Sequence, residues 1–517
     1  MTSGAAGVDP KGPGGPDASP DPTRRHAVVP LAVGLFLASR ALYWILGVRF
    51  DTSPLIDYWQ YIDPPLLRGD LLASLAYLHS QPPLFNLFLG LVLKGAPAAY
   101  PVLFATVYLA MGLGLYLVGI ALVRRLGLQP GWALGLVSLF SLLPVGVLYE
   151  SWLFYPLPLA LLLTGSALLL DGALLQPTGR RLLALFAVIA TLCLTASPFH
   201  LVFYLAVVGV VVGARRVRWQ VTVGAALGPG FALLLLYGWH VVAFGRFGTQ
   251  SWVGMSVAKV VLRHIPVAER RALVAKGTLS PLALITPFSA LDAYPPPFRI
   301  VPSGTPDRPV LTSALKSTGA TNYNHIAYLG IADRYLADTL VAARREPRAF
   351  VAGVGTAWAY YVKAGTDSPF LEPNRGRISH LAGLVERLVY LRAPAPLAYV
   401  LEPEDQSDWA WSVVIALPLL CAWGGRRAFR ALRSADADER RRGWVLAYLV
   451  GSVVYVAVVG NTLEVVENNR FRVVTEPLIL ALGAAWLGER LAQGDPETQR
   501  LAPRSSWPAT RRTKRGL

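Results

Sequence analysis

The sequence predicts an all-α fold, a polytopic transmembrane helical bundle of roughly ten crossings with long outer-face loops. The chain is 54% hydrophobic and 15% charged, whereas a soluble protein carries about 25% charged residues. The mean hydropathy is +0.45. Uncharged apolar runs recur along most of the length, and several match the ~20 residues that span a bilayer. These observations exclude a large soluble helical protein.

Arginine clusters between the apolar runs predict the topology. The net charge is +17. The clusters are Arg124/Arg125, Arg180/Arg181, Arg215/Arg216 and residues 426–442. Cytoplasmic segments are enriched in Lys and Arg, so an even number of crossings should separate each cluster from the next. Membrane orientation therefore explains the positive charge, and we expect no nucleic-acid partner.

The chain divides into five expected regions. They are a disordered tail (1–23), an N-terminal transmembrane module (24–243), a large outer-face region with membrane-associated helices (244–408), C-terminal transmembrane helices (409–490) and a basic cytoplasmic tail (491–517). The expected crossings are 24–48, 101–123, 130–148, 152–173, 182–197, 199–214, 220–243, 409–424, 443–460 and 471–490. Both termini are then cytoplasmic, and residues 50–100 form the first outer loop. The apolar pieces 349–364 and 380–400 either lie on the membrane surface or cross as a pair.

The apolar run 83–93 is expected to stay outside the bundle. It is much shorter than the ~20 residues needed to span a bilayer. Counting it as a crossing would also move the next three arginine clusters to the outer side. We therefore expect a juxtamembrane or re-entrant helix in the first outer loop, with Pro82 and Pro83 at its start.

Acidic residues gather near aromatic residues in the first outer loop. The stretch "IDYWQYID" places Asp57 and Asp63 beside residues such as Trp59 and Tyr61. Tyr and Trp favour the membrane interface, where a partly desolvated carboxylate can act as a general base. Asp57 is therefore a candidate base or a structural acid. Asp63 is a candidate site residue or a turn residue.

Two charged residues stand in apolar surroundings. Glu150 lies in a very short outer hairpin, where an acid is costly unless it faces a cavity, a cation or a substrate. Arg40 lies inside the first helix, and an intramembrane arginine marks a functional site unless it pairs with a carboxylate.

The start of the last helix carries arginines on the expected outer side. Arg470 and Arg472 oppose the positive-inside bias, so they need an anionic partner. That partner is either a lipid phosphate or one of the nearby acids Glu467 and Glu476.

These outer-face motifs together resemble the GT-C superfamily of polytopic membrane glycosyltransferases, near the protein mannosyltransferase and aminoarabinose-transferase branch. The motifs are "IDYWQY", "HSQPPLF", "LYESWLFYP" and "ENNRFRVVTEP". The resemblance covers the architecture from about residue 27 to residue 490. The chain departs from the family at two points. Tyr58 follows Asp57 where the family often has a second acid, and Ser80 and Gln81 separate His79 from the prolines.

The resemblance implies an inverting enzyme that uses a polyprenyl-phosphate sugar as donor at the outer face of a bacterial inner or plasma membrane. The acceptor would be a cell-envelope glycan, lipid or protein. Asp57 would be the base, and Glu150 would orient the acceptor or help to hold a divalent cation such as Mg²⁺ or Mn²⁺. The residues expected to hold the donor phosphate are His79, Arg40, Lys259, Arg263, Arg470 and Arg472. The further expected site residues are Asp63, Tyr61, Gln81, Tyr155, Glu467 and Glu476. The sequence assigns no metal ligand set.

Two other functions remain open at this point. A transporter or flippase for a lipid-linked sugar would favour internal repeats and polar groups near the midplane. Arg40 lies at such a depth, but the sequence shows no repeat. Another membrane transferase or polymerase for lipid-linked glycans would share the outer-face acids, but it need not have the early motifs in this order.

Overall fold

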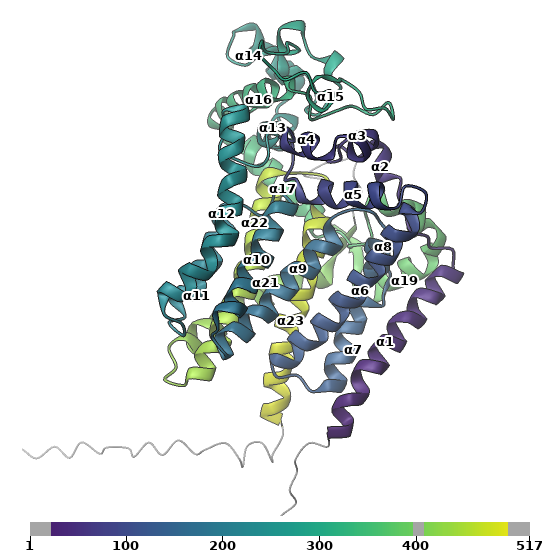
Figure 1. The fold of residues 1–517 in the computed structure, drawn as a ribbon, viewed down its shortest axis with the longest axis vertical. Coiled ribbons are helices and arrows are strands. Elements are labelled where there is room, and N and C mark those ends of the chain that lie inside the picture. Colours follow the sequence, from purple (N-terminus) through teal and green to yellow (C-terminus); the bar gives the residue numbers. More distant parts are fainter. Residues whose placement is uncertain (1–21, 396–407, 495–517) are drawn as a thin grey trace, which may run out of the picture.

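The computed structural model describes residues 22–395 and 408–494 as a bundle of long helices with shorter helices across one end (Figure 1). Most of the expected tails (1–23 and 491–517) lies outside the described residues, but residues 22–23 belong to the first helix and residues 491–494 to the last. The strands β1 (Arg392–Pro394) and β2 (Asp408–Ala410) pair antiparallel, and the described part has no longer strand. The prediction of an all-α polytopic membrane fold is confirmed.

All ten expected crossings are helical, although the third is broken in two. The helices are α1 (Pro22–Ile45), α6 (Tyr100–Arg125), α7 (Pro130–Ser141), α8 (Pro144–Glu150), α9 (Pro156–Leu175), α10 (Gly179–Thr195), α11 (Leu201–Gly213), α12 (Trp219–Phe244), α21 (Trp411–Leu432), α22 (Ala437–Leu463) and α23 (Asn468–Gly494). Seven described helices are long and apolar enough to cross, or eight if α7 and α8, which meet at 59°, form one broken span. The helices α10, with 17 residues, and α11, with 13, are shorter. Ten crossings therefore stay a prediction.

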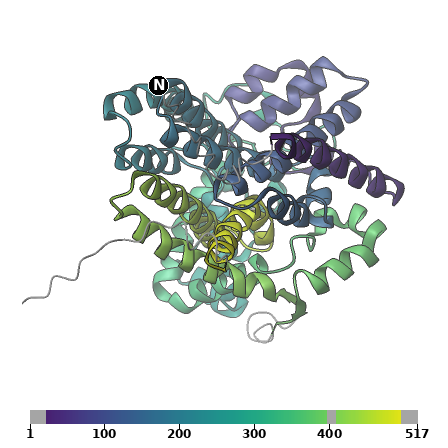
Figure 2. The same ribbon diagram turned by 90° about the horizontal axis from the view of Figure 1, so that it is seen from below.

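The helices α9 and α23 form the centre of the bundle. Each buries 67% of its apolar window inside the protein, and Figure 2 shows α23 enclosed by its neighbours. Leu163 and Leu170 of α9 and Leu478 and Leu482 of α23 are fully buried in one hydrophobic core. A helix that is apolar all round is stable only when other helices surround it.

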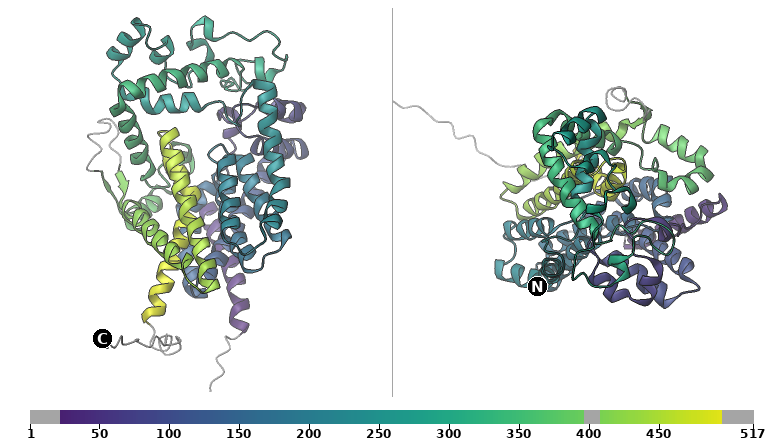
Figure 3. Two further views of the ribbon diagram at one scale, coloured as in Figure 1. Left: turned by 90° about the vertical axis from the view of Figure 1, so that its left-hand side faces the viewer. Right: turned by 90° about the horizontal axis from the view of Figure 1, so that it is seen from above.

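Charged residues concentrate at the end of the bundle where α1 begins and α23 ends (Figure 3). The carboxylate of Asp171 pairs with Arg441, and it lies 3.9 Å from a guanidinium nitrogen of Arg125. Arg427 pairs with Glu489 at the same end. Arginines at the end of α6, in α21 and near the start of α22 therefore lie on the side opposite to the short helices.

The short helices at the other end form a cap. They are α2 (Pro54–Asp57), α3 (Pro64–Gly69), α4 (Leu71–Ala76), α5 (Leu84–Gly95), α13 (Val253–Val261), α14 (Val267–Ala275), α15 (Pro309–Thr312), α16 (Ala327–Arg345) and α17 (Pro347–Tyr361). Single 3₁₀ turns are η1 (Leu262–His264), η2 (Pro281–Leu284), η3 (Leu291–Ala293) and η4 (Pro296–Phe298). The cap has its own hydrophobic core, in which Met255, Val261, Leu282 and Ile331 are fully buried. It is therefore a packed layer rather than a loose loop.

The helix α5 is the short apolar helix expected in the first outer loop. It has 12 residues, begins directly after Pro83 and runs across the capped end of the bundle (Figure 1). Its Asn86 is buried: the side-chain oxygen accepts from the Ile62 N–H at 2.8 Å, and Nδ2 donates to the Gln60 carbonyl at 2.9 Å. This polar residue inside an apolar run therefore holds the acid–aromatic segment onto α5.

The apolar pieces 349–364 and 380–400 do not form long helices in their described residues. The helix α17 has 15 residues, and α19 (Ser379–Leu388) has 10, against the ~20 that a span requires. The elements η5 (Pro369–Leu371), α18 (Glu372–Arg375) and η6 (Gly376–Ile378) connect them. The exposed side chains of Leu384 and Leu388, 53% and 68% accessible, give α19 the outward apolar face typical of a surface-lying helix.

We expect Gly254→Leu to destabilise the cap, because α13 and α16 touch at this residue. A Cβ on Gly254 would lie 1.8 Å from the Ala332 carbonyl oxygen. Overpacking of this kind costs about 1–3 kcal/mol or more. The thermal unfolding midpoint in detergent should fall by several degrees. Gly383→Leu, where a Cβ meets nothing within 4 Å, is the control, and equal midpoints for both variants would contradict the packing.

Candidate functional site

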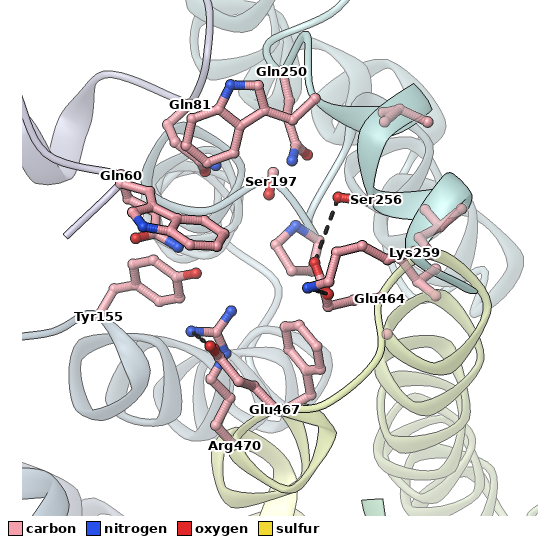
Figure 4. A pocket seen from close by; sticks show the side chains of 18 of the residues that line it. Gln60, Gln81, Tyr155, Ser197, Gln250, Ser256, Lys259, Glu464, Glu467 and Arg470 are labelled. Atoms are coloured by element: carbon pink, nitrogen blue, oxygen red, sulfur yellow. Dashed lines mark hydrogen bonds and ion pairs between the residues drawn. The ribbon is translucent and has the colours of Figure 1, made fainter. Parts of the chain in front are cut away.

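A cavity lies between the cap and the capped ends of the bundle helices (Figure 4). We call it the cap cavity. Its walls come from the 59–60 segment, the turn between α10 and α11, the helix α13, and the turn between α22 and α23. Its empty space is about 770 Å³, part of which is open to solvent. Segments far apart in the sequence thus meet at one place.

The turn between α22 and α23 brings two acids to this cavity. Glu464 and Glu467 both line it. The side chain of Asn468 is fully buried and donates to the Glu464 carbonyl at 2.9 Å and to the Asn461 side chain at 2.9 Å. Val466 has a φ of +98°, a region that β-branched residues rarely adopt. Backbone strain of this kind is concentrated at functional sites.

The carboxylate of Glu464 is fully engaged. One oxygen lies 2.5 Å from Lys259 Nζ, and the other accepts from Ser256 Oγ at 3.4 Å. The Val465 N–H also donates to it at 3.0 Å. Lys259 and Ser256 stand one turn apart on α13, so this ion pair connects the cap to the bundle.

The carboxylate of Glu467 has one partner in the described part of the chain, Arg470 at 2.6 Å. The Arg470 guanidinium also lies 5.3 Å from the ring centre of Phe154 and 5.2 Å from that of Phe471, which are cation–π distances. Its Nε is buried without a hydrogen-bond partner among the described residues. Arg470 therefore keeps donor capacity for an anion.

Aromatic and amide side chains form the opposite wall. Trp59 stacks on Phe288 with ring centres 5.1 Å apart. The side chains of Gln60, Gln81 and Gln250 surround the cavity (Figure 4). Each amide offers both donors and acceptors, and an aromatic face binds apolar ring surfaces. Such a wall suits a ligand that has both hydroxyl groups and C–H faces, as a sugar has.

The cap cavity gathers five of the residues predicted from the sequence and leaves nine outside. The five are Gln81, Tyr155, Lys259, Glu467 and Arg470. The nine that do not line it are Arg40, Asp57, Tyr61, Asp63, His79, Glu150, Arg263, Arg472 and Glu476. The Tyr61 hydroxyl is buried and donates to the Leu153 carbonyl, and Arg263 is exposed at η1.

Asp57 and Asp63 lie at the cap surface beside Lys316. The exposed Asp57 makes no hydrogen bond or ion pair within the described residues, so its role as base stays a prediction. Asp63 accepts two hydrogen bonds from Ser317 at 2.7 Å. Lys316 is buried and donates to the Tyr58 carbonyl at 2.7 Å. Burial lowers the pKa of Lys316 to about 8, and the two acids oppose this shift.

Arg40 and Glu150 pair with each other inside the bundle. Arg40 Nε and Nη2 lie 3.0 and 2.6 Å from the two Glu150 oxygens, and Nη1 donates to the Ser141 carbonyl at 2.8 Å. The pair occupies a separate small cavity below α8. The structure thus contains the carboxylate partner that the sequence left open for Arg40.

Arg472 and Glu476 form a second internal pair. Arg472 is fully buried, its Nε lies 3.0 Å from Glu476, and it also donates to the Tyr361 carbonyl. Arg470 and Arg472, two residues apart on α23, thus face different surroundings. Only Arg470 reaches the cap cavity.

His79 is a structural tie between the first outer loop and the cap. Its Nδ1 lies 2.8 Å from Ser251 Oγ, and its Nε2 lies 2.9 Å from the Asn324 carbonyl. Nε2 must carry the proton, because a carbonyl can only accept. Burial lowers the pKa of His79 to about 3, so the ring is neutral near pH 7. In this state it offers no positive charge to a phosphate.

Sequence reasoning did not assign several wall residues of the cap cavity. Glu464 carried the same signal as Glu150, an acid at an apolar helix end, and could have been found that way. Trp59 and Gln60 lie within the quoted acid–aromatic motif, but only the fold shows that they, and not Asp57, turn inward. Gln250 and Ser256 stand in a segment without any recognisable motif.

We expect the Tm of the wild type to fall more between pH 7.5 and pH 5 than that of His79→Gln. The folded-state pKa of His79, about 3, lies below the ordinary value of 6.5, so the unfolded chain takes up the proton first. The stability that His79 contributes is full above pH 6.5 and is lost as the pH falls towards 3. The loss at pH 5 should be about 2 kcal/mol. Equal falls in Tm for both proteins would contradict the burial of His79.

Comparison with known proteins identifies no relative: no protein-family model, no curated protein and no solved structure matches the chain. Among the described residues, no group of three or more His, Cys, Asp or Glu side chains is placed to hold a metal ion. The function is therefore argued from the site itself.

Proposed function

We propose that this chain is an integral membrane glycosyltransferase that moves a sugar from a polyprenyl-phosphate-linked donor to a cell-envelope acceptor. The observation that carries the proposal is the cap cavity. It combines two Glu–cation pairs, Glu464–Lys259 and Glu467–Arg470, with aromatic and amide walls at the ends of apolar helices. This position lets a lipid-borne substrate keep its chain in the bilayer while its head group enters the cavity.

The leaving phosphate needs positive charge, and Arg470 and Lys259 supply it. A guanidinium presents a planar set of donors that matches phosphate oxygens, and Arg470 has a buried Nε without a partner among the described residues. Only 8% of its side chain is exposed, so little water competes with a bound anion. Lys259 supports the same charge from the cap side.

Glu467 is the carboxylate best placed to be the base within the cavity. Its single ion pair leaves accepting capacity, whereas three donors occupy Glu464. In the proposed step Glu467 takes the proton of the acceptor hydroxyl, and that oxygen bonds to the anomeric carbon. The bond from this carbon to the phosphate oxygen breaks, and its electron pair stays on the phosphate. Attack opposite to the leaving group inverts the sugar.

The distribution of charge supports an outward-facing cap. The ion pairs of Arg125, Arg427 and Arg441 lie at the end opposite to the cap cavity. Arginine-rich ends of bundles face the cytoplasm. On this basis both termini are cytoplasmic, the protein is multi-pass in the inner or plasma membrane, and the site opens on the outer face.

Glu467→Gln should lower sugar transfer by about 100-fold or more, the usual loss on removing a general base. The assay uses purified protein in liposomes, a radiolabelled polyprenyl-phosphate sugar and a crude envelope acceptor. Glu372→Gln is the matched control, because Glu372 also pairs with an arginine three residues on, but at an exposed position. If Glu467→Gln transfers sugar as fast as the control while Asp57→Asn does not, the base is Asp57 and the role proposed for Glu467 is wrong.

A transporter for a lipid-linked sugar is the second candidate. Broken helices and intramembrane ion pairs are typical of transporters, and α7 and α8 meet at 59° beside the Arg40–Glu150 pair. The same liposomes separate the two functions. Movement of the labelled lipid to the other leaflet with its sugar–phosphate bond intact would establish transport and contradict transfer.

A further inference from the structure

Two more cavities connect the cap cavity to the side of the protein. The first encloses about 600 Å³ and shares Gln250 and Val253 with the cap cavity. We call it the histidine cavity. The second, the lateral groove, encloses about 1030 Å³ and shares Phe244 and Leu329 with the histidine cavity. The three cavities therefore adjoin one another, in the order cap cavity, histidine cavity and lateral groove.

The histidine cavity is polar but carries no net charge. Among the described residues its one cation is Arg246, which pairs with Asp333 and also donates to the Leu329 carbonyl at 2.7 Å. His79 and His240 line it as well. His240 is 2% exposed, and its Nε2 has no hydrogen-bond partner among the described residues. Backbone groups of Gly248 and Leu78 lie beside the His240 ring. The imidazole is thus a buried polar group in the wall that a ligand hydroxyl can meet.

The lateral groove is lined mainly by apolar residues, with Ser303 and Thr305 among the polar ones, and it begins at the end of α12. Phe244, in its wall, is the last residue of the long apolar helix α12. The opposite wall is the 297–306 segment of the cap, including Phe298 and Ile300. Exposed apolar side chains continue outward on both sides: Val242 is 79% exposed and Ile300 is 65% exposed. These residues give a hydrocarbon chain apolar contacts along the groove, beside the polar side chains of Ser303 and Thr305.

We propose that the acceptor is a lipid-anchored glycan, with its hydrocarbon chain in the lateral groove and its neutral saccharide in the histidine cavity. Its terminal hydroxyl then reaches past Gln250 towards Glu467. This inference rests on the proposed function and narrows the acceptor to one class. A water-soluble glycan or a protein would leave the apolar groove unused, and an anionic head group would meet a cation that is already paired.

Photo-crosslinking tests the path without any turnover. The probe is a monohexosyl diacylglycerol with a diazirine in one acyl chain, in nanodiscs that hold the full-length protein. We expect cross-links at the 297–306 segment and near Phe244. Unlabelled glycolipid should compete for them, and phosphatidylcholine should not. Labels spread evenly over the membrane-facing helices, or equal competition by phosphatidylcholine, would overturn the inference.

Bulky substitutions that fill the lateral groove or the histidine cavity test whether these cavities are needed for sugar transfer. Gly330 lines the groove and Gly248 lines the histidine cavity, and a Cβ on either meets nothing within 4 Å. Gly330→Trp and Gly248→Leu should each reduce cross-linking and sugar transfer to the glycolipid at least tenfold. Gly383→Trp on α19, also open at its Cβ, is the control and should change neither.

Two further readouts separate this inference from the proposed function. Hydrolysis of the donor by water reports whether the cap cavity cleaves the sugar–phosphate bond at all. Gly330→Trp should leave the rate of donor hydrolysis unchanged. It should also leave unchanged the transfer of sugar to a methyl hexoside, an acceptor that has no lipid chain. Equal loss for the methyl hexoside and the glycolipid would overturn the acceptor path. No donor cleavage by the wild type would instead contradict the transferase, whatever the cross-linking shows.

Discussion

The pairing of buried charge is the constraint on which the bundle depends. An unpaired ion among apolar helices costs several kcal/mol, and an opposite charge with good geometry offsets most of that cost. Arg40 meets Glu150, Arg472 meets Glu476, and Arg441 meets Asp171. These pairs lie in the interior or at the arginine-rich end. The pairs Glu467–Arg470 and Glu464–Lys259 differ because they border the cap cavity.

The position of the cap cavity is set by the short turn between α22 and α23. The central helix α23 and its neighbour α22 meet at residues 464–467, where a buried asparagine and a left-handed Val466 hold the acids in position. The cap then closes over the turn with α13, which supplies Lys259 and Ser256. Bundle and cap therefore share the site, and neither forms it alone. The charged residues of the site therefore come from segments that are distant in the sequence: Lys259 from α13 in the cap, and Glu464 and Glu467 from the turn between α22 and α23.

Much of the fold followed from the sequence, because apolar length and arginine spacing depend on the bilayer alone. The short α5 and the helicity of every expected crossing were predicted on that basis. Which polar residue faces inward was harder to predict. Arg470 and Arg472 look alike in the sequence, yet only one reaches the cavity. Asp57 and Trp59 are two residues apart and both are exposed, yet only the tryptophan lines the cavity. Which side chains line the cavity is decided by contacts between segments distant in the sequence, and a local sequence pattern gives no information about those contacts.

If the cap cavity binds the phosphate of a polyprenyl-linked sugar, a bound substrate analogue should be visible there. The most direct measurement is a cryo-electron microscopy structure of the protein with a polyprenyl-phosphonate sugar whose bond to the sugar cannot be cleaved. We expect the phosphonate against Arg470 and Lys259, with the sugar beside Trp59 and the lipid chain reaching the bilayer. Density for the head group at the Arg40–Glu150 pair, with an empty cap cavity, would contradict it.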